Sequence, residues 1–239
     1  MSLTFSVVIP ALNEAARIEA CVAAVLAEAA AAPDLAVEVI VASGDSEDET
    51  AALARGAGAE VVTGARGRGV QCNAGAARAT GDVILFLHAD TRLPAGAFPL
   101  LRRHFQDPGL QAGTFRLGFD EEYWLYDVYT AFSRFDSVLT SFGDQCIVIR
   151  RPFFEKIGGF PDWPLFEDVR LLQKTRARTR LRSFPARVTT SARRFAREGV
   201  IRQSLRNGWY VLQYLCGASP HDLASRYERI RTGAKIADH

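Results

Sequence analysis

The chain has 239 residues, of which 48% are hydrophobic, 23% charged and 10% aromatic, a composition typical of globular proteins and unlike that of disordered, collagen-like or coiled-coil chains. This length accommodates one α/β domain and buries a sizeable core without disulfides or structural metals. The formal net charge is +2, which argues against a general nucleic-acid binder, because such proteins carry a strong excess of positive charge.

The small net charge conceals an uneven distribution along the chain. Residues 1–60 contain ten acidic and two basic side chains, whereas residues 174–206 contain eleven basic and one acidic side chain. The basic segment therefore either meets an anionic ligand or forms a solvated basic face.

The four cysteines lie far apart, and no Cys-x-x-Cys pair indicates a zinc knuckle or a dithiol redox site. We expect them to be reduced and buried, as in a cytoplasmic protein. The first residues lack the basic start of a secretory signal, and no apolar run approaches the roughly 20 residues of a membrane-spanning helix. The predicted location is therefore the cytoplasm.

In the first 90 residues, short apolar runs alternate with segments of helical periodicity. Strands are predicted at 5–9, 39–41, 61–62 and 83–87, and helices at 18–26, around 51–54 and at 70–79. Asn13 is the expected cap of the first helix, and Ser46 with Glu49 forms the expected capping box of the second. Continuous apolar strands that alternate with helices predict a parallel sheet covered on both faces.

After residue 90 this alternation loosens. Strands are predicted at 114–119 and 146–149, and an arginine-rich region leads to helices near 200–215 and 220–230, the last opened by Ser219-Pro220. An aromatic helical stretch between the two strands either packs in the core or offers a platform to a ligand. Its aromatic side chains are Trp124, Tyr126, Tyr129, Phe132 and Phe135. The simplest organisation is one domain, 1–239, with a nucleotide-binding half to about residue 92 and a half from about 93 that completes a second site.

Open parallel sheets bind ligands at the carboxyl ends of their strands, so the residues after each strand carry the chemistry. The chain has no Gly-x-Gly-x-x-Gly after its first strand and no phosphate-binding loop, which disfavours dinucleotide oxidoreductases and P-loop enzymes. The second strand runs into the polar segment 43–48, which either binds a ligand or only caps a helix. Asp90 follows the apolar strand at 83–87, where its carboxylate requires a divalent cation or a hydrogen-bond donor.

Three strand-end motifs occur in order. They are Ser6-Val7-Val8-Ile9-Pro10-Ala11-Leu12-Asn13-Glu14, Gly44-Asp45-Ser46-Glu47-Asp48-Glu49-Thr50 and His88-Ala89-Asp90-Thr91. Later motifs are Gly143-Asp144-Gln145, Gly158-Gly159-Phe160, Glu167-Asp168 and Ser191-Ala192-Arg193-Arg194-Phe195. With this combination the chain resembles a family 2 glycosyltransferase over about residues 4–228, and is similar to the bacterial subgroup labelled "transferase 2, radical-SAM/selenodomain-associated". The resemblance implies the GT-A fold, an α/β Rossmann-like fold with a mixed, mostly parallel central sheet flanked by helices, and further helices at the C-terminus.

The resemblance implies a nucleotide-diphospho-sugar donor, with UDP favoured over GDP. Pro10, Ala11 and Glu14 would line its base and ribose. Ser43 stands where the family usually has an acid that holds the base, and Asp45, two positions on, is the residue expected to compensate.

His88-Ala89-Asp90 occupies the place of the family's Asp-x-Asp metal motif. Asp90 is expected to bind Mn²⁺ or Mg²⁺, because a hard oxygen ligand together with two phosphate groups suits either ion. His88 is a metal ligand, a nucleotide-sugar contact through the ribose, or a packed core histidine.

Glu167-Asp168 opens a helix and matches the family's catalytic motif. By the resemblance Asp168 is the general base, which removes the proton of the acceptor hydroxyl while that oxygen attacks the anomeric carbon and inverts its configuration. The alternative is a pair of acids that only stabilises a helix N-terminus. Three arginines are further candidates for contacts with the diphosphate or the acceptor: Arg68, Arg193 and Arg194.

Two other functions stay open. A sugar nucleotidyltransferase also uses metal-binding acids, but it needs a glycine-rich basic loop where this chain has Ala11-Leu12-Asn13-Glu14. A binding module would use the arginine-rich stretch and the helix at 209–215 to meet an anionic partner or the inner face of a membrane. Such a helix more often packs on its own domain or on a second copy of the chain, as in a homodimer. A lipid-linked hydroxyl acceptor would connect membrane binding with glycosyl transfer.

Overall fold

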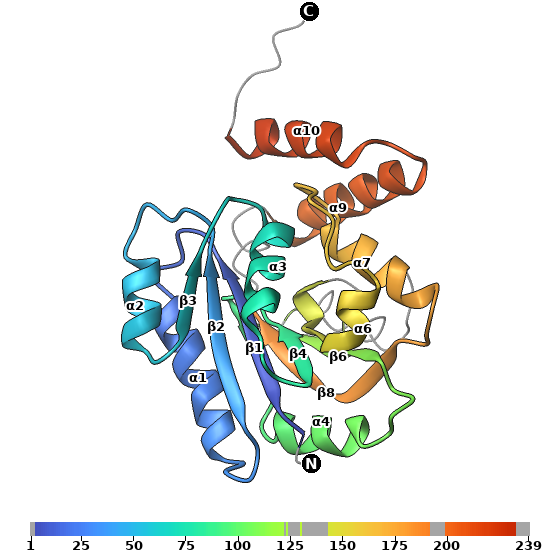
Figure 1. The fold of residues 1–239 in the computed structure, drawn as a ribbon. Helices are drawn as coiled ribbons and strands as arrows, with labels where there is room; N and C mark the ends of the chain where they lie inside the picture. The colour runs from blue at the N-terminus through green and yellow to red at the C-terminus, as the bar shows by residue number, and fades with distance from the viewer. Residues whose placement is uncertain (1–2, 122, 124–129, 131–142, 192–198, 233–239) are drawn as a thin grey trace, which may run out of the picture.

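The computed structural model of the protein describes residues 3–121, 123, 130, 143–191 and 199–232. In this part of the chain, eight strands form one twisted sheet with helices on both faces (Figure 1). The order of the strands is β3-β2-β1-β4-β7-β6-β8-β5. Their bounds are β1 Phe5–Ala11, β2 Val37–Ser43, β3 Glu60–Thr63, β4 Val83–Phe86, β5 Thr91–Arg92, β6 Ala112–Phe119, β7 Ile147–Arg150 and β8 Arg182–Thr190.

The first four strands of the chain are mutually parallel, so their carboxyl ends share one edge of the sheet. Val7 of β1 lies opposite Val39 of β2 and Leu85 of β4. The later strands mix directions, because β7 runs antiparallel to β4 and β6, β5 runs antiparallel to β8, and β6 runs parallel to β8. The predicted mixed, mostly parallel sheet is therefore confirmed.

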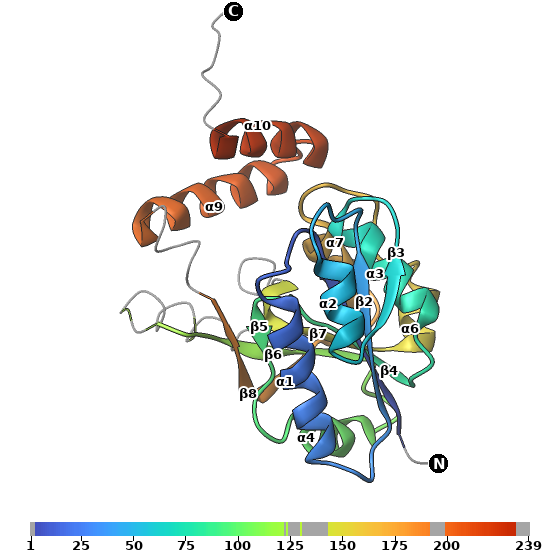
Figure 2. The ribbon, with the colours of Figure 1, turned by 90° about the vertical axis from the view of Figure 1, so that its left-hand side faces the viewer.

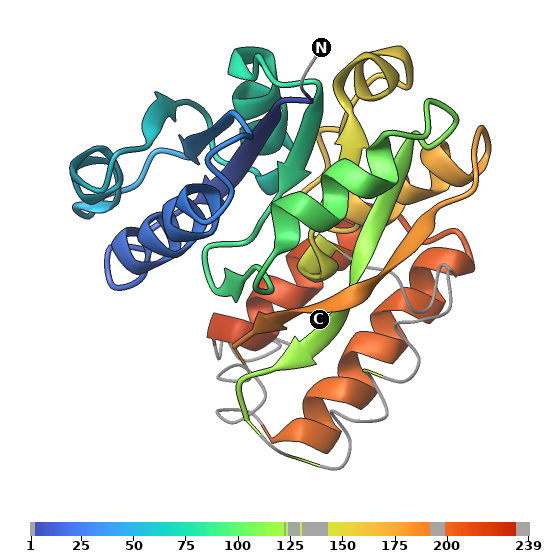
Figure 3. The ribbon, with the colours of Figure 1, turned by 90° about the horizontal axis from the view of Figure 1, so that it is seen from below.

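The helices cover the sheet in two layers. The bounds are α1 Ile18–Ala30, α2 Thr50–Gly56, α3 Arg68–Arg78, α4 Ala97–Phe105, α6 Arg151–Lys156, α7 Glu167–Arg176, α9 Val200–Leu215 and α10 Pro220–Thr232, and a short 3₁₀ helix spans Gly143–Gln145. On one face, α1 and α4 touch each other and bury Val7 and Ile9 of β1 (Figure 3). On the other face, α3, α6 and α7 bury Val8. Successive residues of β1 thus enter opposite cores, which is why Val7, Val8 and Ile9 are all apolar.

The last two described helices stand apart from these layers. Figure 2 shows α9 and α10 beyond the carboxyl ends of the parallel strands. They are joined to the rest by a third apolar cluster, in which Tyr210, Val211 and Leu223 meet Phe166 and Val169 at the start of α7. This attachment places both helices over the edge of the sheet where strand-end residues gather.

Two predicted helix caps are wrong. α1 begins at Ile18, and no side chain caps it. Asn13 instead has a φ of 53°, its side-chain oxygen accepts a hydrogen bond from the Glu47 amide (2.9 Å), and its own amide donates to Ser46 Oγ (3.2 Å). α2 begins at Thr50 without a side-chain cap, and Ser46 and Glu49 form no capping box. These polar side chains connect the two loops after β1 and β2, and that use competes with capping.

Other predictions are confirmed with small shifts or fall outside the described residues. The strand predicted at 146–149 is β7, one residue later, and Pro220 is the first residue of α10. The four cysteines are free, and three are buried, but Cys216 is exposed, which corrects the expectation that all are buried. The aromatic stretch 124–135, except Thr130, lies outside the described residues. None of the described helices is long and apolar enough to cross a membrane.

Candidate active site

The shared carboxyl edge of β1, β2 and β4 carries two hollows. The first has a volume of about 420 Å³ and lies beside the ends of β2 and β3. The second has a volume of about 180 Å³ and lies after β4, below α9 and α10. The loop between β3 and α3 connects them in sequence, because Gly64 and Ala65 line the first hollow and Arg68 lines the second.

The first hollow has a mixed polar and apolar lining, and Asp45 is the one charged side chain among the described residues that line it. It is lined by Ser43, Asp45, Ser46, Ala51, Thr63, Gly64 and Ala65. Ser43 is buried, and its hydroxyl lies 3.0 Å from that of Ser46, whereas Asp45 is exposed and has a φ of 58°. Sequence reasoning placed Ser43 and Asp45 together in one binding site, and the structure brings them to the same hollow.

The predicted donor residues of β1 lie next to this hollow without lining it. Pro10 and Ala11 are the last residues of β1, paired with Ala42 and Ser43 of β2. The Glu14 carboxylate pairs with Arg17 at 2.9 Å, and the Glu14 amide donates to Thr50 Oγ1 at 2.8 Å.

Gln71 supports this edge and was missed by the sequence analysis. Its buried side-chain amide donates to the carbonyl oxygens of Ala11 (2.6 Å) and Ala42 (2.9 Å), and so ties β1 to β2 where both strands end. A Cβ on Gly44 would lie 2.6 Å from the Gln71 side chain, so only glycine leaves room for this brace. A glutamine in the middle of a helix gives no sequence signal for such a role.

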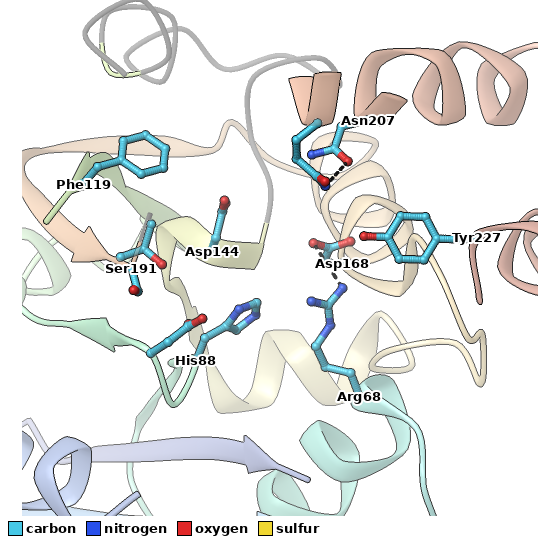
Figure 4. Close-up of a pocket in the computed structure, with 11 residues that line it drawn as sticks. Arg68, His88, Phe119, Asp144, Asp168, Ser191, Asn207 and Tyr227 are labelled. Atoms are coloured by element: carbon cyan, nitrogen blue, oxygen red, sulfur yellow. Dashed lines mark hydrogen bonds and ion pairs between the residues drawn. The ribbon is translucent and has the colours of Figure 1, made fainter. Parts of the chain in front are cut away.

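The second hollow collects most of the predicted catalytic and metal-binding residues. It is lined by Arg68, His88, Asp90, Phe119, Asp144, Asp168, Thr190, Ser191, Gln203, Asn207 and Tyr227. His88 and Asp90 come from the turn after β4, Arg68 from the start of α3 and Asp168 from the start of α7. Figure 4 shows His88, Arg68 and Asp168 pointing into one space. His88 is partly exposed there, so it is not a packed core histidine.

Two acids at the start of α7 hold Arg68. Arg68 Nε donates to a carboxylate oxygen of Glu167, and Arg68 Nη2 lies 3.9 Å from Asp168 Oδ2. Glu167 is 1% exposed and does not line the hollow, and its burial raises the pKa of its carboxyl, an effect that Arg68 partly offsets. Asp168 is 8% exposed, and its Oδ1 accepts a hydrogen bond from the Val169 amide at 2.7 Å. Of the two acids, Asp168 is therefore the one that a ligand in the hollow meets.

Asp144 is a further acid of this hollow, to which sequence reasoning assigned no role. Its Oδ1 is shielded from solvent and has no hydrogen-bond partner among the described residues. The pKa of Asp144 is raised to about 6, first by burial and also by repulsion from Asp168 and Asp90, while Arg68 acts in the opposite direction. The Gly143-Asp144-Gln145 motif was visible in the sequence, but the repulsion between three acids appears only after folding.

The hollow suits a divalent cation that is held partly by a ligand. No group of three or more His, Cys, Asp or Glu side chains that could hold a metal alone exists within the described ranges. Mg²⁺ and similar ions often use one or two carboxylates and take the remaining ligands from substrate phosphates and water. Asp90 and Asp144 fit this pattern. Their carboxylates line the same hollow and repel each other, and a cation between them would cancel that repulsion.

Several lining residues come from segments that carry no motif. Phe119 ends β6, Gln203 and Asn207 belong to α9, and Tyr227 reaches in from α10 (Figure 4). The Tyr227 ring packs against Tyr210, with centroids 5.5 Å apart. Arg193 and Arg194 lie outside the described residues.

One known protein family matches the N-terminal two thirds of the chain. The model of the family described as "Glycosyl transferase family 2" matches residues 6–159, more than half of the chain. None of the curated proteins matches the chain.

Solved structures share the fold at low sequence identity. The mannosyltransferase PcManGT from Pyrobaculum calidifontis, in complex with GDP-Man and Mn²⁺, is 19% identical with a TM-score of 0.59, over 79% of this chain and 57% of that one. TarS 1-349 from S. aureus, in complex with UDP-GlcNAc, is 15% identical with a TM-score of 0.60, over 79% and 58% of the two chains. Glucosyl-3-phosphoglycerate synthase from Mycobacterium tuberculosis, in complex with Mn²⁺, UDP and phosphoglyceric acid, is 23% identical with a TM-score of 0.54, over 79% and 69%.

These likenesses confirm the predicted GT-A fold. The chain spans less than two thirds of the mannosyltransferase and of TarS 1-349. The family model identifies glycosyl transferase family 2 without distinguishing its subgroups. Membership of the radical-SAM/selenodomain-associated subgroup therefore stays a prediction.

Proposed function

The chain belongs to glycosyl transferase family 2, and we propose that it transfers a sugar from a nucleotide-diphospho-sugar to a hydroxyl acceptor, with inversion at the anomeric carbon. The observation that carries this proposal is the pair of hollows at the carboxyl edge of the sheet, one lined by Ser43 and Asp45 and one lined by acids and Arg68. A donor bound across both would have its base at the first hollow and its diphosphate and sugar at the second.

The first hollow supports recognition of the nucleotide. Ser43 and Asp45 would face the base, while Pro10, Ala11 and Glu14 would contact the base and ribose from the end of β1. We favour UDP over GDP because the structures of TarS and of glucosyl-3-phosphoglycerate synthase contain UDP-GlcNAc and UDP. The structure of PcManGT contains GDP-Man instead.

The second hollow supports a site for the diphosphate. Asp90 would hold Mn²⁺ or Mg²⁺ together with the donor's phosphate oxygens, with His88 beside it. The bound ion would supply positive charge to the diphosphate as it leaves. The structures of PcManGT and of glucosyl-3-phosphoglycerate synthase both contain Mn²⁺. Arg68 would add a fixed cation, and Arg193 and Arg194 are proposed to contact the diphosphate or the acceptor.

Asp168 is the proposed general base. The acceptor oxygen would form a bond to the anomeric carbon, the bond from that carbon to the diphosphate would break on the opposite face, and the hydroxyl proton would pass to Asp168. Arg68 Nη2 lies 3.9 Å from Asp168 Oδ2, so the proposed base stands beside a guanidinium. Glu167, the other acid of the catalytic motif, does not line the hollow. Its proposed role is to position Arg68, to which it is hydrogen-bonded.

A panel of donors tests the proposal. We expect one UDP- or GDP-sugar to raise the unfolding temperature with Mn²⁺ present, because a ligand that binds only the folded state stabilises it. The same donor should be hydrolysed or transferred, and Asp168→Asn should slow that reaction by about 10²-fold or more. Asp222→Asn is a matched control, because Asp222 is an exposed acid in the first turn of α10. The proposal fails if no donor of the panel binds, or if both variants react at the same rate.

A further inference from the structure

Helix α9 has two apolar faces, and only one of them is covered. On the covered face, Tyr210 and Val211 pack against Phe166 and Leu223, and Gln203 lines the second hollow. The opposite face exposes four large apolar side chains: Leu205 (71%), Trp209 (60%), Leu212 (51%) and Leu215 (45%). Among the described residues, these are four of the six large hydrophobic side chains that are exposed.

The exposed side chains form a continuous stripe. Leu205, Trp209 and Leu212 follow the i, i+4, i+7 spacing that places residues on one side of a helix. Single exposed leucines are common on protein surfaces, whereas a contiguous apolar patch marks an interaction site. We name the stripe of Leu205, Trp209, Leu212 and Leu215 the α9 surface.

Charge favours an anionic surface as the occupant. Helices α9 and α10 with the residues that join them, 199–232, contain five arginines and two acidic residues, Asp222 and Glu228. Arg202 is exposed next to the α9 surface, and Arg226 is exposed on α10. Leucine and tryptophan on one side of a helix, bordered by arginines, are typical of helices that lie in the headgroup region of a bilayer.

A second copy of the chain fits less well. A two-fold dimer would press the same patch against itself, so each Arg202 would face another basic border, because residues 199–232 carry three more positive than negative side chains. Anionic headgroups supply the missing negative charge.

We infer that the α9 surface docks on an anionic lipid membrane. Gln203 and Asn207 of the same helix line the second hollow, so docking would hold the mouth of that hollow within about one helix diameter, roughly 10–12 Å, of the headgroups. The docking does not depend on the proposed function. If that function holds as well, the geometry favours an acceptor hydroxyl that is itself anchored in the membrane.

Vesicle flotation tests the inference without any enzymatic activity. We expect the protein to float with vesicles of phosphatidylcholine and phosphatidylglycerol at low salt, and to float less with phosphatidylcholine alone or at high salt. The triple variant Leu205→Ser/Trp209→Ser/Leu212→Ser should bind the anionic vesicles about ten-fold more weakly or worse. If the triple variant unfolds at a lower temperature than the wild type, Trp209→Ser alone takes its place.

Two charge-reversal variants, one beside the α9 surface and one far from it, provide the matched control. Arg202→Glu should weaken binding about five-fold or more, whereas Arg103→Glu, an equal change on the exposed side of α4 at the far end of the molecule, should not (Figure 1). The inference is overturned if the wild type does not float with anionic vesicles, if both charge variants bind equally, or if the serine variants bind as the wild type does. A wild-type dimer that the serine variants convert to a monomer, with no vesicle binding, would assign the α9 surface to a second copy and overturn the inference too.

Discussion

Asp144 is a buried acid whose stability contribution changes with pH. Burial and the nearby acids raise the pKa of Asp144 from 3.8 to about 6 in the folded protein. A raised pKa means that the folded state binds the proton more tightly than the unfolded state does. The protonated Asp144 therefore adds its full contribution to the free energy of unfolding below about pH 4, and this contribution is lost as the pH rises through about 6.

Asp144→Asn should remove this loss. The free energy of unfolding of the variant relative to the wild type should increase by about 1–3 kcal/mol between pH 4 and pH 7.5. Chemical denaturation at several pH values measures this difference. A difference that stays constant across the range would contradict the assigned environment of Asp144.

The pair of Glu167 and Arg68 differs from the surface ion pairs of the molecule in its burial. Glu167→Gln removes a buried charge partner of Arg68, whose side chain is 39% exposed, and should lower the free energy of unfolding by about 2 kcal/mol. Glu60→Gln breaks the Arg78–Glu60 pair, in which both side chains are exposed, and should cost less than about 1 kcal/mol. Equal losses in urea denaturation would show that burial does not set the strength of these pairs.

At the scale of elements, strands β1 to β4 could be predicted because each is apolar on both faces. β8 could not, because a proline and two arginines interrupt its sequence and its buried residues form no apolar run. Phe184 and Val188 point inward, whereas Arg182, Pro185 and Arg187 are exposed. Its pairing with β6 also shifts register between Thr114 and Arg116, which breaks the period of the pattern.

The contact between α3 and β1 gives a test at this scale. A Cβ on Gly75 would collide with the Val8 side chain, whereas a Cβ on Gly208 in α9 would meet nothing within 4 Å. Alanine favours a helix over glycine by about 1 kcal/mol, but overpacking a core costs about 1–3 kcal/mol. Gly75→Ala should therefore lower the unfolding temperature, while Gly208→Ala should raise it or leave it unchanged. A stabilised Gly75→Ala would contradict the tight approach of α3 to β1.

Across the whole molecule, folding brings together residues that are far apart in sequence. Asp90 was predicted from a strand-end motif and Asp168 from the motif that opens a helix, and both line one hollow together with His88. The sequence did not indicate that Tyr227 and Asn207 would close the same hollow, because their place depends on how α9 and α10 attach to α7 through Phe166 and Val169. Motifs thus predict strand ends well, whereas the walls contributed by distant helices depend on packing.

The fold gathers several of the acidic side chains of the chain at the candidate site. The acidic first part supplies Asp45 to the nucleotide side of the edge, and Asp90, Asp144 and Asp168 add three acids to the second hollow, with Arg68 as the cation from α3. The small net charge of +2 therefore results from segments of opposite charge and does not argue against a site that handles phosphate.

Asp90 is proposed to hold the donor and Asp168 to act in the chemical step, and one titration paired with a rate measurement separates these two roles. Binding of the preferred nucleotide-sugar with Mn²⁺ should weaken about ten-fold or more in Asp90→Asn. It should stay within about two-fold of the wild type in Asp168→Asn, whose turnover at saturating donor falls by about 10²-fold or more. Donor binding that is unchanged in Asp90→Asn, together with full turnover in Asp168→Asn, would contradict the account.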